Sequence, residues 1–212
     1  MQLYYDLAKL IRRGAVISET TTWVFRAAPA IVLATILLAA TVVPFDGRAA
    51  LIRFSGDAVA FAYALGLGRF FLVLAALDTG SSFEGMGASR DVTFASLIEV
   101  SLFFSFVALG LATRQLSLSG MLGQSFAGQW TATLPSLILI AGSLFATLLA
   151  ECARVPVDDP ATHLELTMVH EVMVLDHSGP DLTTIQLGAA TKLFAPTSGS
   201  DRAGSAKTAE RS

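Results

Sequence analysis

The sequence predicts an all-α integral membrane protein with about four transmembrane helices, an N-terminal amphipathic helix and a cytoplasmic loop helix. First, 53% of the 212 residues are hydrophobic and only 15% are charged, whereas soluble domains carry about 25% charged residues. Second, the mean hydropathy is +0.63. Third, four apolar stretches approach or exceed the roughly 18 residues that a transmembrane helix needs.

Residues 1–22 are predicted to form an amphipathic helix at the membrane surface. Its apolar residues recur at helical spacing, with charged residues on the other faces; they are Leu3, Leu7, Leu10 and Ile11, against Asp6, Lys9, Arg12 and Arg13. The same periodicity is equally typical of a solvated helix packed on protein. The segment has no early apolar core or small-residue cleavage site, so it does not resemble a secretory signal.

The first two transmembrane spans are predicted at about 27–44 and 57–77. The first has no charged residue, and at 1.5 Å per residue it is roughly 27 Å long, just enough to cross the hydrocarbon core. In the second, Gly66 and Gly68 favour close approach of another helix. Arg69 lies near the middle of the second span.

The third and fourth spans are predicted at about 92–112 and 130–150, the third carrying Glu99 and the fourth Pro135 near its start. Between the second and third spans, residues 78–91 are rich in Gly and Ser, and this composition predicts a flexible connector. The alternative is a backbone segment placed against a partner protein.

The distribution of basic residues predicts which side of the membrane each loop occupies. With four spans, the segment before the first span, residues 78–91 and the stretch from Glu151 share one side. That side holds Lys9, Arg12, Arg13, Arg26, Arg90 and Arg154, against Arg48, Arg53 and Arg114 on the other. Because positive residues favour the cytoplasm, the polar stretch is predicted to be cytoplasmic.

The polar stretch 151–185 is predicted to be an acidic cytoplasmic loop at the mouth of the bundle, where it docks a redox partner and feeds protons. Its first part holds Glu151, Asp158, Asp159, Glu165, Glu171, Asp176 and Asp181. Asp159 and Pro160 predict a helix start, with the helix running to about Leu175 and ending at Ser178-Gly179-Pro180. Residues 195–212 are predicted to be a disordered tail.

Arg69 and Glu99 are charged residues inside predicted spans, and each costs about 2.5–3.5 kcal/mol near the bilayer centre. Arg69 lies nine residues before Asp78, and Glu99 lies nine residues after Arg90. If the two spans are antiparallel, both residues lie about 13 Å from the inner surface. We therefore expect them to face each other, directly or through water; the alternative is that each pairs elsewhere or extends to the interface.

Composition and spacing also exclude several functions. The net charge is −3, and the absence of a long basic run argues against a nucleic acid partner. A single cysteine, Cys152, excludes an intramolecular disulfide and a multi-cysteine metal site. His163, His170 and His177 recur every seven residues, whereas chelating pairs prefer a spacing of four. A solvated or proton-buffering role is therefore expected for them, and no metal site.

Two long motifs carry a family resemblance: LDTGSSFEGMGASRD and ECARVPVDDPATHLELTMVHEVMVLDHSGPDL. With YYDLAKLIRRGAV near the start, they resemble the membrane subunit of group 4 energy-converting hydrogenases. That family comprises formate hydrogenlyase subunit 4 and hydrogenase-4 component C and is homologous to subunit 1 of respiratory complex I (NADH-quinone oxidoreductase). The resemblance covers residues 4 to about 194, which makes 1–194 a partial subunit-1-like membrane domain.

The resemblance implies a subunit that anchors a peripheral hydrogenase or quinone-reducing arm and conducts protons. It implies a proton path or polar core of Arg69, Glu99, Glu151, Asp158 and Glu165, and subunit docking through Asp78, Arg90, Arg154, Asp159 and Glu171. It places the chain in the inner (plasma) membrane with hydrogenase large and small subunits, an iron–sulfur subunit and antiporter-like subunits. Iron–sulfur clusters and a nickel–iron site are expected in those partners, and no cofactor in this chain.

The family has eight spans, whereas this chain shows four, so the chain is predicted to be truncated at both ends. A Ser-, Gly- and Ala-rich tail follows Leu193-Phe194, where another span is expected. Two alternatives therefore stay open: a purely structural membrane anchor, and a non-functional fragment. A stand-alone transporter is disfavoured because neither internal repeats nor broken helices are visible.

Overall fold

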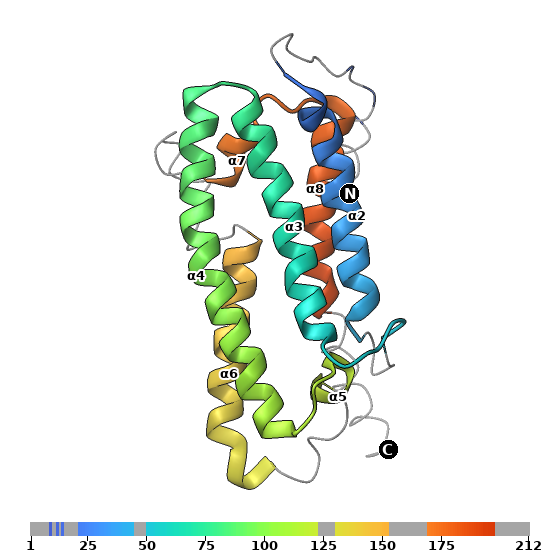
Figure 1. Cartoon of the computed structure of the whole chain (residues 1–212), viewed down its shortest axis with the longest axis vertical. Coiled ribbons are helices and arrows are strands. Elements are labelled where there is room, and N and C mark those ends of the chain that lie inside the picture. The colour runs from blue at the N-terminus through green and yellow to red at the C-terminus, as the bar shows by residue number, and fades with distance from the viewer. Residues whose placement is uncertain are drawn as a thin grey trace, which may run out of the picture.

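The computed structural model describes residues 21–44, 50–122, 130–152 and 169–197, together with residues 9, 12 and 14. Seven helices account for most of these residues (Figure 1): α2 (Trp23–Val42), α3 (Asp57–Asp78), α4 (Ser82–Thr113), α5 (Leu118–Leu122), α6 (Trp130–Glu151), α7 (His170–Met173) and α8 (Gly179–Thr197). No strand occurs in this part of the chain. The predicted all-α membrane fold is confirmed.

Three helices, α2, α3 and α4, are long and apolar enough to cross a bilayer. The fourth predicted span corresponds to α6, whose apolar part from Pro135 to Glu151 is shorter. The predicted surface helix of residues 1–22 falls almost wholly outside the described residues, as do the tail from residue 198 and most of the predicted loop helix, 160–168.

Helix α3 lies between α2 and α4, with α8 beside α2 and α6 beside α4 (Figure 1). A buried cluster that includes Ile36, Leu72, Met173 and Ile185 joins α2, α3, α7 and α8. Small residues allow these helices to approach closely. A Cβ atom added at Gly68 of α3 would lie 2.6 Å from Thr35 Oγ1 of α2.

The predicted flexible connector 78–91 is wrong in extent, because α3 continues to Asp78 and α4 already begins at Ser82. Only Thr79–Ser81 connects them, with Gly80 in the left-handed region at φ 70°. The small residues that predict a loop instead allow α7 to pack closely against α4. A Cβ atom at Gly87 would lie 3.1 Å from the Val169 carbonyl oxygen and 3.2 Å from Met173 Cγ.

A helix occupies the end of the predicted acidic loop 151–185, because α8 begins at Gly179. The Ser178-Gly179-Pro180 sequence predicts a helix end. Proline is also favoured in the first turn of a helix, because a backbone N–H there would have no intrahelical acceptor and its loss costs nothing. Helix α8 then packs along α2. Its packing is close at Gly188, where an added Cβ atom would lie 2.8 Å from Ile36 Cδ1.

Candidate functional site: a chain of ion pairs between two cavities

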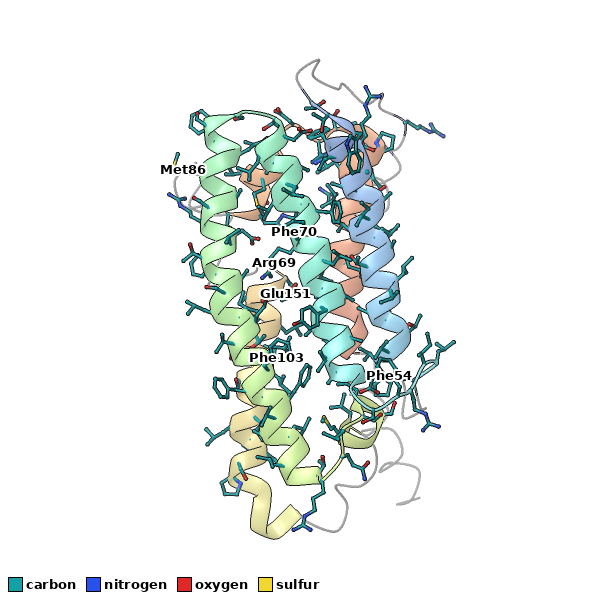
Figure 2. All side chains as sticks on the ribbon, viewed as in Figure 1. Phe54, Arg69, Phe70, Met86, Phe103 and Glu151 are labelled. Carbon is teal, nitrogen blue, oxygen red and sulfur yellow. The ribbon has the colours of Figure 1, made fainter. Side chains whose placement is uncertain are left out.

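Four charged side chains from four helices form a continuous chain of ion pairs in the middle of the bundle. Arg69 of α3 lies with its Nε atom 3.5 Å from Asp91 Oδ2 of α4. Its Nη2 group donates a hydrogen bond to Glu151 Oε2 at the end of α6, and Figure 2 shows these two side chains pointing toward each other. Lys192 Nζ of α8 donates to Glu151 Oε1 at 3.1 Å. Positive and negative groups therefore alternate along the chain.

The short connection between α3 and α4 decides which carboxylate Arg69 meets. Arg69 lies nine residues before Asp78, the last residue of α3, and Asp91 lies nine residues after Ser82, the first residue of α4. In an antiparallel pair these positions lie at the same depth. The predicted direct pair of Arg69 with Glu99 is therefore wrong, since it assumed a longer loop.

Glu99 nevertheless lies near the ion pairs, in the wall of the same cavity. A Cβ atom at Gly66 of α3 would lie 3.3 Å from Glu99 Oε1, so the glycine makes room for the carboxylate. Glu99 forms no ion pair with any described residue. The prediction of a water-mediated contact with Arg69 stays a prediction.

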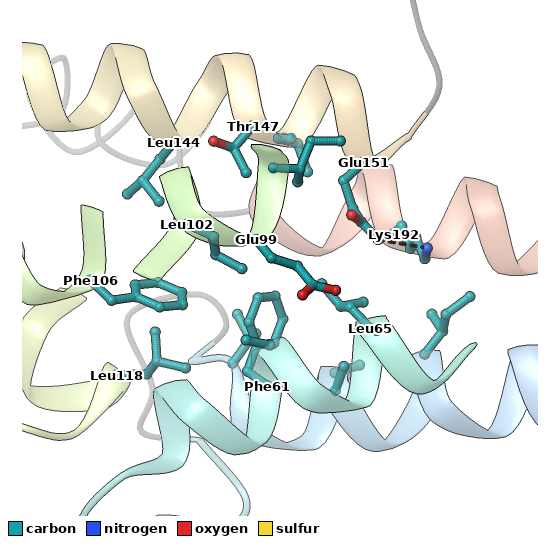
Figure 3. Close-up of a pocket in the computed structure, with 18 of the residues that line it drawn as sticks. Phe61, Leu65, Glu99, Leu102, Phe106, Leu118, Leu144, Thr147, Glu151 and Lys192 are labelled. Atoms are coloured by element: carbon teal, nitrogen blue, oxygen red, sulfur yellow. Dashed lines mark hydrogen bonds and ion pairs between the residues drawn. The ribbon is translucent and has the colours of Figure 1, made fainter. Parts of the chain in front are cut away.

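The cavity has a volume of about 320 Å³ and lies between α2, α3, α4, α6 and α8. Most of its lining is apolar, and its charged members are Arg69, Glu99, Glu151 and Lys192. Figure 3 shows the carboxylates of Glu99 and Glu151 toward one end, and Phe106 and Leu118 toward the other. The site is thus an apolar chamber with one charged end.

A second, smaller cavity of about 40 Å³ adjoins the same charges. Arg69, Glu151 and Lys192 line both cavities, whereas Asp91, Cys152 and His170 line only the small one. The chain of ion pairs therefore lies between the two cavities. The three charged side chains that both cavities share can contact a group in either.

The structure brings together two of the predicted polar-core residues, Arg69 and Glu151, and places Glu99 in the same cavity. The predicted polar-core residues Asp158 and Glu165, and the predicted docking residues Arg154 and Asp159, lie outside the described residues. Among the other predicted docking residues, Glu171 is exposed on α7 and Arg90 is half-buried on α4. The Asp78 carboxylate accepts hydrogen bonds from Thr22 N at 2.7 Å and Thr22 Oγ1 at 2.9 Å, which ties the end of α3 to the start of α2.

Three charged residues of this region are absent from the sequence-based prediction. Asp91 falls in the predicted loop, and Lys192 lies close to the predicted tail. A lone lysine in an apolar stretch could have indicated a buried ion pair. Glu84, in the first turn of α4, is only 1% exposed. Its Oε1 atom accepts a hydrogen bond from Asp176 N at 3.0 Å, so it joins α4 to the link between α7 and α8.

The expectation of solvated histidines is wrong for His177, whose side chain is only 3% exposed. Its ring stacks on Phe25 of α2, with 4.0 Å between ring centroids and 5° between ring planes. Neither ring nitrogen has a hydrogen-bond partner among the described residues. Burial lowers the pKa of His177, and the negative charges of Asp181 and Asp176 oppose this only in part.

We expect the buried His177 to make the protein less stable as the pH falls below about 6.5, the ordinary pKa of histidine. In this range the unfolded chain binds a proton at His177, whereas the folded protein, in which the pKa of His177 is lowered, does not. Acid therefore favours unfolding. The slope is on the order of 1 kcal/mol per pH unit between the ordinary pKa and the lowered one. The measurement is the unfolding temperature between about pH 5 and 8, for the unsubstituted protein and for His177→Phe.

The phenylalanine keeps a ring on Phe25 and removes the titrating group. The His177→Phe protein should therefore lose less stability on acidification than the unsubstituted protein. Identical pH dependence in the two proteins would show that His177 does not contribute to it.

Comparison with known proteins places the chain among membrane subunits of redox complexes. A family model described as NADH dehydrogenase matches residues 1–198. Hydrogenase-4 component C of Escherichia coli (strain K12) is 30% identical over 191 residues, which cover 90% of this chain and 59% of the relative. Formate hydrogenlyase subunit 4 of the same organism is 26% identical over 192 residues, covering 91% and 61%.

The fold is also that of a solved respiratory complex. A chain of the membrane-bound sulfane sulfur reductase, an archaeal respiratory membrane complex, superimposes with a TM-score of 0.72 at 20% identity. The match covers 92% of this chain and 62% of the other chain. The present chain therefore spans about three fifths of the length of the proteins that it matches.

Proposed function

Because the chain belongs to the protein family described as NADH dehydrogenase, we propose that it is the membrane-anchoring and proton-conducting subunit of a hydrogenase- or formate hydrogenlyase-like oxidoreductase complex. In this role the chain docks the peripheral electron-transfer arm. The relatives of highest similarity reported above are hydrogenase-4 component C and formate hydrogenlyase subunit 4. They favour a hydrogenase-like complex.

The observation that carries the proton-conducting role is the alternating charge chain beside a carboxylate without a cation. Glu151 is held between Arg69 and Lys192. Glu99 lies in the wall of the same cavity and forms no ion pair with a described residue. Glu99 is therefore the group assigned to take up and release protons, and the ion pairs supply fixed charge beside it.

The cavity gives Glu99 a route to other groups. Its volume of about 320 Å³ exceeds the roughly 30 Å³ that one water molecule occupies in the liquid, so it has room for several. A proton reaching the charged end of the cavity meets Glu99 before it meets the apolar end. The cavity lining around Phe106 and Leu118 is apolar and limits proton leakage in the other direction.

The proposal also places the chain in its complex. Acidic groups gather where α3 meets α4 and α7 meets α8, and they include Asp78, Glu84 and Asp176. We assign this end to the cytoplasm, with the loop that holds Arg154 and Asp159, and with the peripheral arm docked on it. Iron–sulfur clusters and a nickel–iron site belong to the hydrogenase small and large subunits and the iron–sulfur subunit, and antiporter-like subunits lie alongside in the inner membrane.

Replacing Glu99 with glutamine in the assembled complex is expected to reduce proton transfer coupled to electron flow by at least about 100-fold, the lower end of the range for losing a positioned acid–base group. Electron flow itself should continue, because the proposal assigns the redox groups to other subunits. The measurement is proton uptake by membrane vesicles per electron transferred. Glu99→Asp keeps a carboxylate in the cavity and serves as the control that retains coupling. Unchanged coupling in Glu99→Gln would remove Glu99 from the proton path.

A purely structural anchor is the second candidate function. Its support is that Asp91, Arg69, Glu151 and Lys192 compensate one another, as expected for charges that only fix helix packing. Both candidates bind the peripheral arm, so copurification does not separate them. Coupling that survives in Glu99→Gln favours the anchor.

A further inference from the structure

The interface between α4 and α6 contains four hydroxyl side chains that the ion pairs do not use. Ser143 and Thr147 of α6 are spaced four residues apart, and Glu151 follows after four more, so all three lie on one helix face. Ser101 and Ser105 of α4 face them. Ser105 Oγ lies 2.9 Å from Ser143 Oγ, and Ser101 Oγ lies 3.3 Å from both Ser143 Oγ and Thr147 Oγ1. We call these four residues the hydroxyl ladder.

The four hydroxyl hydrogens of the ladder can be assigned from the acceptors around them. Ser105 Oγ donates to the Ser101 carbonyl oxygen, and Thr147 Oγ1 donates to the Ser143 carbonyl oxygen, each at 2.8 Å. Both hydroxyl oxygens are then left to accept across the interface. Ser143 can then donate to Ser105, and Ser101 can donate to Thr147 or to Ser143.

This assignment gives the ladder one bond in each direction between the helices. Two of the four hydrogens are committed to carbonyl oxygens, which cannot pass a proton on. Beyond Ser105 lies the apolar cluster around Phe106 and Leu118. The ladder is therefore a poor proton relay, and it is well suited to hold two helices in one register.

Register matters here because, apart from the ion pairs of Glu151, α6 has few other contacts that fix it. Among the described elements, α6 packs chiefly on α4, and apolar side chains gain little from a neighbouring helix over lipid. A slip of one residue moves each side chain by 1.5 Å along the axis and 100° around it. Such a slip would break both interhelical hydroxyl bonds and carry Glu151, one turn beyond Thr147, away from Arg69.

We propose that the hydroxyl ladder of Ser101, Ser105, Ser143 and Thr147 sets the register of α6 and so positions Glu151 between Arg69 and Lys192. The described hydrogen bonds of the ladder include none to these three charged groups, so the ladder acts through the position of Glu151. The proposal concerns helix register and rests on the proposed proton-conducting function only for its second readout.

The first readout is the reactivity of Cys152, the single cysteine of the chain. It follows Glu151 directly and is 7% exposed, so its thiol reports on the end of α6. In membranes containing the assembled complex, N-ethylmaleimide modification of the Cys152 peptide is followed by mass spectrometry. Ser143→Ala should raise the modification rate about threefold, the ratio that matches one interhelical hydrogen bond in a membrane.

Two control variants are measured beside Ser143→Ala. Ser96→Ala removes a hydroxyl of α4 that bonds only within its own helix, to the Thr93 carbonyl oxygen, and should leave the rate unchanged. Ser143→Thr keeps a hydroxyl and should stay closer to the unsubstituted protein than Ser143→Ala does. A rate that is equal in Ser143→Ala and Ser96→Ala overturns the proposal, whatever the outcome for proton coupling.

The second readout is a double-mutant cycle on proton coupling. If Ser143 acts only through Glu151, Ser143→Ala should reduce coupling about threefold alone and cause no further loss in a Glu151→Gln background. An additional loss in that background overturns the positioning role. If Glu99→Gln leaves coupling intact, the proposed function fails, while the Cys152 measurement still decides the register of α6.

Discussion

Replacing Arg69 with methionine is expected to destabilise the protein by about 3–5 kcal/mol, the cost of removing one partner from a buried ion pair. The substitution leaves both Asp91 and Glu151 without their shared cation, in a site where the paired side chains are only 11–15% exposed. Solvent screening is therefore weak. The measurement is the free energy of unfolding of the protein in mild detergent.

Two further variants separate charge from shape at this position. Arg69→Lys keeps a positive charge but cannot contact both carboxylates with a planar group, so a smaller loss is expected. Adding Asp91→Asn to Arg69→Met removes the carboxylate whose ion pair was with Arg69, whereas Glu151 keeps Lys192, and should restore part of the stability. If Arg69→Met and Arg69→Lys unfold alike, the two ion pairs do not stabilise the bundle.

Replacing Gly68 with alanine is expected to cost about 2–3 kcal/mol, because the added methyl group overfills the contact between α3 and α2. The new Cβ atom would lie 2.6 Å from Thr35 Oγ1 and 3.8 Å from Val32 Cα. Thr35 has little room to yield, since it is buried and donates its hydroxyl to the Val32 carbonyl oxygen. Unfolding in detergent again gives the measurement.

The chain offers matched controls for this substitution. Gly142→Ala on α6 meets no atom within 4 Å and should be neutral or slightly stabilising, because alanine favours helix over glycine. Thr35→Ala removes the atom that clashes and should recover most of the loss in the double variant. A Gly68→Ala protein as stable as the Gly142→Ala protein would show that the two helices separate without cost.

The two effects act on the same element, α3, for different reasons. Gly68 lets α3 approach α2, and the next residue, Arg69, lies about 100° further around α3 and reaches α4 and α6. Small and charged residues side by side in a membrane helix thus combine close packing with a buried charge. The ion-pair chain depends on both, since Lys192 belongs to α8, which packs on α2.

Composition and long motifs were enough to identify a helical membrane protein and the family to which it belongs. These follow from local composition and long motifs, because a lipid-facing helix must be apolar along its whole length whatever it packs against. Arg69 and Glu151 were also identified from the sequence, since charges near apolar spans are costly and stand out.

Only the tertiary structure decided which charges meet. The Gly- and Ser-rich residues before Asp91 have weak intrinsic preferences, and contact with α7 favours a helix there. Because α4 therefore begins earlier than predicted, Asp91 rather than Glu99 pairs with Arg69. The same Gly-Pro pair can end or begin a helix, and packing of α8 on α2 selected the beginning and brought Lys192 to Glu151. Which charged side chains pair depends on their relative depth in the bundle and on which helix faces meet. The composition of a single segment carries no information about either.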